Sequence, residues 1–311
     1  MMNDKLNPTD ASLSTMWAIN NYPDLNVFFH VSRELGFQKI ELNHQIDSSM
    51  LSQVHLDHVQ FSSIHEPCPA DIPTKELVDR DWLISSPAEA SRKHGVDAVR
   101  NSIRLAHRLG APVVVVHCGN VTTNTAPESA LRKLFEAGLS KSEEYLDIKS
   151  RYIQTRELLA SPRLEAVKKS LNELLDYADL HQVKLGLENR YHYMDIPSLD
   201  EMQELLNLAD AGRLGFIYDV GHAQALDRLG FSAHADWLNR FSPRMLGAHL
   251  HDVIGVSDHL SPGLGEIDFK LISAYIPENS FRTLELNPGN TLAQVKQGLR
   301  LLVDDGCINY L

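Results

Sequence analysis

The amino-acid sequence predicts an α/β protein folded as a closed (β/α)₈ barrel, in a single domain spanning residues 1–311. Eight short runs rich in Val, Ile and Leu alternate with amphipathic stretches along the chain, as strands and helices do around a parallel sheet. No low-complexity tract or Pro/Ser-rich linker divides the chain. A doubly wound open sheet is the alternative, but eight uninterrupted units favour closure into a barrel.

The strand predictions rest on apolar runs of the kind found in buried parallel strands. They cover residues 14–19, 38–44, 59–65, 112–119, 183–190, 214–221, 245–253 and 281–288.

Helices are predicted where apolar residues recur every three or four positions. In residues 96–110 this pattern stops at Gly110, which suits a helix C-terminus, and Pro112 blocks any continuation. Residues 164–181 and 291–306 show the same helical pattern.

Residues 121–162 add two further helical stretches between the fourth strand and its expected helix. Their charges are mixed in sign, which argues against a nucleic-acid-binding arm. An insertion after a barrel strand lies at the mouth where active sites form. The segment is therefore a candidate lid or a candidate contact in a homo-oligomer, and a solvated surface decoration is the alternative.

Composition is that of an ordinary globular protein, with 43% hydrophobic and 23% charged residues. No run approaches the roughly 20 apolar residues of a membrane span, and the polar N-terminus has no secretory signal pattern. Three widely spaced cysteines suit free thiols in a reducing compartment. We therefore expect a cytoplasmic protein without membrane contacts. The net charge of −12 argues against a broad nucleic-acid-binding surface.

Six predicted strands in succession end in a side chain that can bind a metal. These side chains are His65, His117, Glu188, Asp219, His249 and Glu285. In a parallel barrel the strand ends meet at one mouth, where crowded carboxylates and imidazoles require a compensating positive charge. The sequence thus predicts a divalent cation, and a ligand set of carboxylate and imidazole suits Mn²⁺, Zn²⁺, Co²⁺, Fe²⁺ or Mg²⁺.

Further candidates lie near these strand ends. His222 follows Asp219 by three residues and either reaches into the site or caps the next helix. Arg190 is placed to hold substrate oxygens, and Glu41, inward on the second strand, to hydrogen-bond a ligand or a histidine. Trp17, predicted to point inward on the first strand, would be an apolar wall of the site or a core residue.

Other residues are assigned structural roles. Cys118 is expected in the core, and residues 263–268 (GLGEID) lack the Lys of a phosphate-binding loop, so they are predicted to form a turn that positions His259. Four histidines on predicted helices are expected at the surface: His94, His107, His181 and His234.

The motifs LGLEN, YDVGHA, AHLHD with HLSPGLGEIDF, and TLELNPG follow one another at predicted strand ends. In this order they resemble the xylose isomerase-like TIM barrel superfamily, which includes sugar-phosphate isomerases and epimerases and metal-dependent apurinic/apyrimidinic endonucleases. The resemblance covers nearly the whole chain. It implies that Glu188, Asp219, His249 and Glu285 form the shared metal core.

The resemblance also implies a second set of ligands. His65, His117, His222 and His259 match positions that the endonuclease branch uses to bind three zinc ions. That branch has an aspartate where this chain has Ser257, and here the aspartate is displaced to Asp258. Asp252, by the same resemblance, is expected to orient a neighbour rather than bind the metal.

The function predicted from these residues is isomerisation or epimerisation of a small sugar or sugar-like molecule. This chemistry removes and returns a proton next to a carbonyl, while a metal stabilises the enediolate. Glu188 and Glu285 are the candidate acid and base. The candidate substrate contacts are His222, Arg190, Trp17, His65 and His117.

The alternative is phosphodiester cleavage at abasic DNA by a cluster of two or three zinc ions. The full set of histidines favours it. The predicted loops at 43–49 and 66–74 argue against it, because they are neutral to acidic and DNA contacts usually need cations. A merely structural metal in a carbohydrate-binding protein fits poorly with the two glutamates.

Overall fold

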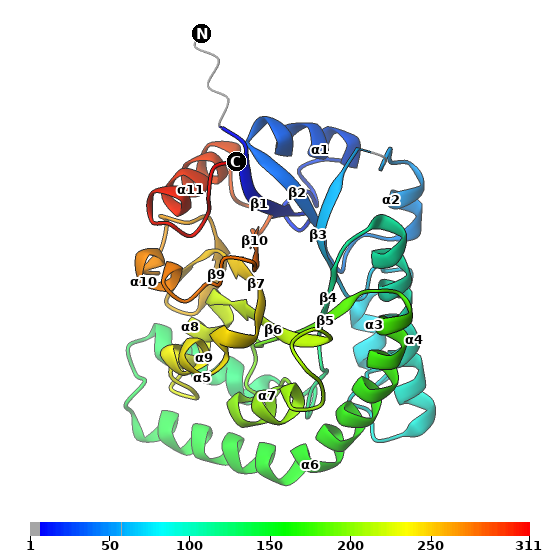
Figure 1. Cartoon of the computed structure of the whole chain (residues 1–311). Helices are drawn as coiled ribbons and strands as arrows, with labels where there is room; N and C mark the ends of the chain where they lie inside the picture. Colours follow the sequence, from blue (N-terminus) through cyan, green and yellow to red (C-terminus); the bar gives the residue numbers. More distant parts are fainter. Residues whose placement is uncertain (1–6, 57) are drawn as a thin grey trace.

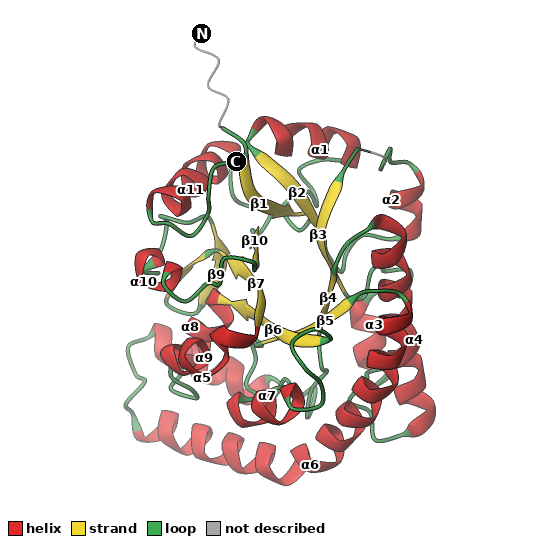
Figure 2. Ribbon diagram, in the orientation of Figure 1, coloured by secondary structure: helices red, strands yellow, loops and turns green. Residues whose placement is uncertain are grey.

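The computed structural model describes residues 7–56 and 58–311. Eight parallel strands close into a barrel in the order β1-β10-β7-β6-β5-β4-β3-β2, with the helices outside it (Figures 1 and 2). The predicted (β/α)₈ barrel is therefore confirmed, and the open sheet is excluded. No helix among the described residues is long and apolar enough to cross a bilayer.

The barrel strands are β1 (Thr9–Ser14), β2 (Phe37–Leu42), β3 (Gln60–His65), β4 (Val113–Val116), β5 (Lys184–Glu188), β6 (Leu214–Asp219), β7 (Met245–Leu250) and β10 (Phe281–Leu284). A separate antiparallel hairpin consists of β8 (Asp252–Ile254) and β9 (Ser257–Leu260). The helices are α1 (Leu25–Glu34), α2 (Ser48–Ser52), α3 (Thr74–Asp79), α4 (Glu89–Leu109), α5 (Ala126–Glu136), α6 (Glu143–Leu180), α7 (Leu199–Leu206), α8 (Val220–Arg228), α9 (His234–Phe241), α10 (Phe269–Ser273) and α11 (Leu292–Asp304).

The first strand prediction is wrong, because β1 ends at Ser14, where the predicted strand 14–19 begins. Residues 15–21 form turns instead. Small polar residues such as Ser12 face the barrel interior from β1, so this strand lacks a continuous apolar run. The apolar signal of residues 16–19 comes from packing against α1, where the Trp17 ring lies 6.4 Å from that of Phe28.

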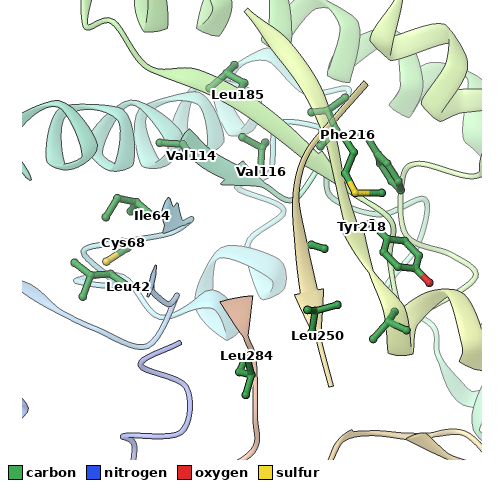
Figure 3. Close-up of a cluster of buried hydrophobic side chains, with 14 of the residues drawn as sticks. Leu42, Ile64, Cys68, Val114, Val116, Leu185, Phe216, Tyr218, Leu250 and Leu284 are labelled. Atoms are coloured by element: carbon green, nitrogen blue, oxygen red, sulfur yellow. The ribbon is translucent and has the colours of Figure 1, made fainter. Parts of the chain in front are cut away.

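Alternation along the strands separates the core from the site. Outward side chains fill the layer between barrel and helices, as Figure 3 shows for Leu250, Leu284 and Tyr218. Their inward neighbours at the strand ends, among them His249 and Asp219, face the barrel axis. Burial of the outward set in the helical layer therefore fixes where the inward set points. All three cysteines are free, as predicted, and all are buried, including Cys118, which was expected in the core.

The barrel interior has an apolar half and a polar half. Val113, Val115 and Ile217 form a separate apolar cluster inside the barrel. On the other side, the Ser12 hydroxyl lies 2.7 Å from that of Thr283. Hydroxyls that bond one another satisfy buried polar groups without charge. This polar half lies beneath the mouth. A chain of hydroxyls connects it to Glu41, which belongs to the site.

The insertion after β4 is present, but its helices differ from the prediction. Two helical stretches within residues 121–162 were predicted to be separate from the helix at 164–181, whereas α6 continues through Pro162 as one helix of 38 residues. Proline removes one hydrogen bond from a helix interior. Packing of α6 against both α4 and α5 compensates for that loss. Figure 1 shows α6 along the outside of the barrel.

A close backbone approach fixes α4, which begins earlier than predicted and ends at Gly110 in the left-handed conformation. A Cβ on Gly95 would lie 2.4 Å from the carbonyl carbon of Leu83 and 2.5 Å from the amide nitrogen of Ile84. Backbone atoms cannot yield as a flexible side chain can. Position 95 therefore requires glycine.

We expect Gly95→Ala to lower the free energy of unfolding by about 1–3 kcal/mol, the usual cost of overpacking. Urea denaturation followed by circular dichroism measures this change. The control is Arg108→Ala at an exposed position of the same helix, which should stay within about 0.5 kcal/mol of wild type. Equal stability of Gly95→Ala and wild type would contradict the close approach.

Candidate metal centre

Two groups of side chains at the barrel mouth lie close enough together to hold a metal ion. The first group is His65, Glu188, His249 and Glu285, and the second is Asp219, His222 and His259. Within each group, one ligand atom per residue lies within 4.8 Å of the others. The predicted strand-end residues are thus brought together by barrel closure.

His249 is at the centre of the first group. Its Nδ1 atom lies 2.9 Å from Glu188 Oε1 and 2.9 Å from Glu285 Oε2. Asp219 Oδ2 lies 3.7 Å from the same nitrogen, so Asp219 connects the two groups. All four side chains of the predicted metal core therefore face one small volume, although Asp219 also belongs to the second group.

Glu41 holds the opposite edge of the His249 ring. His249 Nε2 lies 3.0 Å from Glu41 Oε2, and the Ser63 hydroxyl donates to the same oxygen at 2.6 Å. A carboxylate that accepts the Nε2 proton leaves the Nδ1 lone pair facing the other carboxylates, which is the tautomer that a metal requires. The expected contact between Glu41 and a histidine is thus present.

Electrostatics around His249 fit a bound cation. Burial alone would lower its pKa, but the charges of Glu41 and Glu285 outweigh burial and raise the pKa well above the ordinary value. A proton on Nδ1 and a divalent cation beside Nδ1 are two ways of neutralising the same carboxylates. The donor set of imidazole and carboxylate suits the divalent metals predicted from the sequence.

Glu188 links the first group to two further histidines. His117 Nε2 lies 3.3 Å from Glu188 Oε2, and His65 Nε2 lies 3.7 Å from Oε1. The buried Nε2 atom of His117 thus lies within ion-pair distance of Glu188 but has no partner with hydrogen-bond geometry among the described residues. Arg190 forms an ion pair with Oε2. Burial would raise the Glu188 pKa, but Arg190 and the histidines hold it well below the ordinary value.

The second group forms where α8 begins. Asp219 is the N-cap of α8 and accepts the backbone N–H of His222 at 2.8 Å. His222 itself does not cap the helix, because its Nδ1 atom lies 2.9 Å from the carbonyl oxygen of Asn189. Its Nε2 atom thus remains directed toward the β8–β9 hairpin, 3.9 Å from Asp258 Oδ2.

The hairpin completes the second group. His259 Nδ1 lies 3.0 Å from Asp258 Oδ1, and its Nε2 lies 3.7 Å from Glu285 Oε2. Asp258 therefore faces both His222 and His259, although the sequence displaces it by one position from the related pattern at Ser257. A positive φ of 57° at His259 accompanies this arrangement.

Two residues of the site were left out of the predicted set. His251 places Nε2 3.1 Å from both carboxylate oxygens of Asp219. The His44 ring centroid lies 5.4 Å from that of His65, and its buried Nδ1 atom has no partner among the described residues. Burial and the neighbouring His65 lower the His44 pKa to about 4, which keeps this ring neutral. Both could have been found from the sequence. His44 is the last residue of the predicted strand 38–44, and His251 lies two residues after the predicted ligand His249.

Trp17 does not lie on a strand, contrary to the prediction. Its side chain is 2% exposed, and its indole N–H donates to the carbonyl oxygen of Asn290 at 2.7 Å. The ring packs against Tyr22, with centroids 5.4 Å apart. The indole N–H is therefore already used, and Trp17 has the environment of a core residue.

Asp252 orients backbone rather than a histidine. Its Oδ2 atom accepts the N–H groups of Gly263 and Gly265, and its Oδ1 atom accepts that of Ile267. Residues 263–268 thus form a loop around this carboxylate, beside the hairpin that carries His259.

The surface prediction for four histidines is only partly correct. His94 and His107 are exposed, whereas His181 is half-buried. His234 is also half-buried and contacts the Tyr218 hydroxyl.

A family model described as "Xylose isomerase-like TIM barrel" matches residues 29–303. The chain belongs to this family. An uncharacterized protein, y4fM, from Sinorhizobium fredii (strain NBRC 101917 / NGR234) is 26% identical over 278 residues, which cover 81% of this chain and 76% of that protein.

Three solved structures share this family fold. A D-tagatose 3-epimerase-like protein has 19% identity and a TM-score of 0.65, covering 94% of this chain and 96% of its own. The 3-keto-D-glucoside 4-epimerase YcjR from E. coli has 14% identity and a TM-score of 0.62, covering 95% and 99%. The IolI protein with a bound zinc atom has 15% identity and a TM-score of 0.64, covering 97% and 99%. At such identities the likeness establishes a shared fold.

We expect Glu41→Gln to weaken divalent-metal binding about 10- to 100-fold, because an amide accepts the His249 proton less strongly than a carboxylate. Competition with a fluorescent chelator measures the affinity. Glu165→Gln makes the same chemical change at an exposed position and is the control. Equal affinities of wild type and Glu41→Gln would remove Glu41 from the support of the site.

Metal affinity should also fall as the pH is lowered. The raised pKa of His249 means that the metal-free protein retains a proton that a bound ion must displace. Lower pH favours the protonated, metal-free form, so the apparent affinity should decrease and binding should release protons. Calorimetry in buffers of different ionisation enthalpy counts these protons. Binding without proton release would contradict the assignment of His249.

Proposed function

We propose that the protein is a divalent-metal-dependent isomerase or epimerase of a small sugar or sugar-like molecule. One observation carries the proposal: Glu188 and Glu285 approach the same nitrogen of His249 from strands β5 and β10, each at 2.9 Å. Two carboxylates at one centre supply a base when ionised and an acid when protonated, as proton transfer at carbon requires. The resemblance in fold to sugar epimerases supports this substrate class.

The proposed reaction begins with an ionised carboxylate. Arg190 and the surrounding histidines keep the pKa of Glu188 low, and His249 does the same for Glu285, despite the burial of both. A divalent cation, when bound, would polarise the substrate carbonyl and stabilise the charge that develops there. One glutamate then removes the proton next to the carbonyl.

The second step returns the proton. Return of the abstracted proton by the same glutamate to the adjacent carbon gives isomerisation. For epimerisation the other glutamate must first take up a proton from solvent, which it delivers to the opposite face while the first glutamate keeps the abstracted proton. Arg190, His222, His65 and His117 lie around Glu188 and are proposed to hold substrate oxygens. We also propose that the enzyme acts in the cytoplasm, in keeping with its free cysteines.

A second candidate function is metal-dependent cleavage of abasic DNA. The observation that favours it is the second ligand group, because two or three ions can clamp the attacking and leaving oxygens of a phosphodiester. The overall charge of −12 disfavours this function.

Glu285→Gln and Glu188→Gln should each abolish turnover of the sugar substrate while the melting temperature stays near the wild-type value. An amide cannot accept the proton, so the loss should reach about 10²- to 10⁴-fold. A panel of ketoses and aldoses with wild type identifies the substrate, and Glu165→Gln is the control. Unchanged turnover in Glu285→Gln would remove this residue from the mechanism.

Metal analysis and a nicking assay separate the two functions. Sugar chemistry by the first group predicts at least one tightly bound equivalent and no nicking of abasic duplex DNA. Nicking that is lost in Glu188→Gln would support the endonuclease instead.

A further inference from the structure

The inserted helix α5 contacts two loops that leave neighbouring parts of the barrel mouth. One loop, residues 189–197, follows β5 and carries Arg190. The other is the β8–β9 hairpin, which follows β7 and carries Asp258 and His259. The relative position of these loops decides whether the second ligand group can form.

Arg132 of α5 bonds to the backbone of both loops. Its Nη2 atom donates to the carbonyl oxygen of Tyr191 at 3.0 Å, and its Nη1 atom donates to that of Val256 at 3.3 Å. The planar guanidinium holds its donors in a fixed geometry, so one side chain sets the spacing between two loops.

Tyr191 reinforces the same connection. Its ring lies under the Arg132 guanidinium at 3.9 Å, and its hydroxyl donates to the carbonyl oxygen of Val256 at 2.6 Å. The ring also approaches His222, with ring centroids 5.8 Å apart. Tyr191 is thus a wall beside the second group, anchored to both loops.

Glu128 prevents Arg132 from moving freely. Its carboxylate is 1% exposed and accepts from Arg132 Nη2 at 2.7 Å. It also lies 2.9 Å from His192 Nδ1 and accepts the backbone N–H of Tyr193 at 2.9 Å. A buried carboxylate with this many partners is costly to displace. The junction between α5 and the loop is therefore rigid.

The hairpin is held at its other side by α8. A Cβ on Gly221 would lie 2.1 Å from His251 Cε1 and 2.9 Å from Asp258 Cβ, so the hairpin packs directly on the start of α8. At the hairpin tip, a Cβ on Gly255 would lie 3.6 Å from the Phe135 ring of α5. The hairpin is thus fixed between α5 and α8.

We infer that α5 is a fixed brace rather than a moving lid, and that Arg132 positions Asp258 and His259 against Asp219 and His222. Binding of a second divalent cation then depends on this helix. This inference rests on the metal dependence in the proposed function, but not on the identity of the substrate.

Titration of the metal-free protein with Zn²⁺ against a competing chelator tests the brace. We expect Arg132→Met to weaken the second equivalent about 10- to 100-fold and to leave the first within about threefold. Lys133→Met, at the adjacent exposed position of α5, is the matched control and should resemble wild type. Wild-type uptake of a single equivalent, or an unchanged second equivalent in Arg132→Met, would overturn the inference.

Hydrogen exchange of the metal-free proteins gives a readout that needs no ion. Amides of residues 189–197 and 252–260 should exchange faster in Arg132→Met than in wild type and Lys133→Met. Arg132→Lys should restore protection in part, because lysine keeps the positive charge but lacks the planar fork that reaches both carbonyl oxygens. If Arg132→Met does not fold, Tyr191→Phe is tested in its place. This change removes only the hydrogen bond to the Val256 carbonyl oxygen, and the same amides should exchange faster than in wild type. Unchanged exchange in the variant that folds would refute a brace. Since no substrate is used, failure of the sugar chemistry would leave this result intact.

Discussion

The structure depends on the burial of several carboxylates around one imidazole. Glu188, Asp219 and Glu285 converge on Nδ1 of His249, and Glu41 lies at its other nitrogen. Anionic groups withdrawn from water at such spacing need positive charge among them. The surrounding histidines and Arg190 supply part of this charge, and a bound divalent cation would supply it more completely. Most of the arrangement around the mouth can be understood as support for this centre.

The support comes from two directions. From below, the polar half of the barrel interior connects through the Ser63 hydroxyl to Glu41 and so fixes the His249 ring. From outside, α5 and its contacts to Tyr191 and Val256 hold the loops that complete the second group. The apolar layer between strands and helices keeps the strands in register, so that neither kind of support needs to hold the barrel together.

The two ligand groups are continuous with each other. Asp219 faces His249 on one side and His251 on the other, and Glu285 approaches both His249 and His259. A change in the hairpin position therefore alters the surroundings of Glu285, one of the two proposed proton carriers. For this reason the insertion is connected to the chemistry even though none of its side chains belongs to either ligand group.

The sequence by itself determined the barrel and the candidate ligands at its strand ends. Alternation in a parallel strand places every second residue on the axis, so six strand-end candidates could be identified from local pattern. The family resemblance then singled out Glu188, Asp219, His249 and Glu285 among them. The sequence did not reveal the position of β1, because a strand that lines a polar interior carries no continuous apolar run. Only the tertiary structure brought Glu41 to His249 and Asp258 to His222, and only it made α5 a neighbour of both mouth loops. These contacts join segments that are far apart in the chain, and their geometry is set by barrel closure and helix packing, which no local pattern encodes.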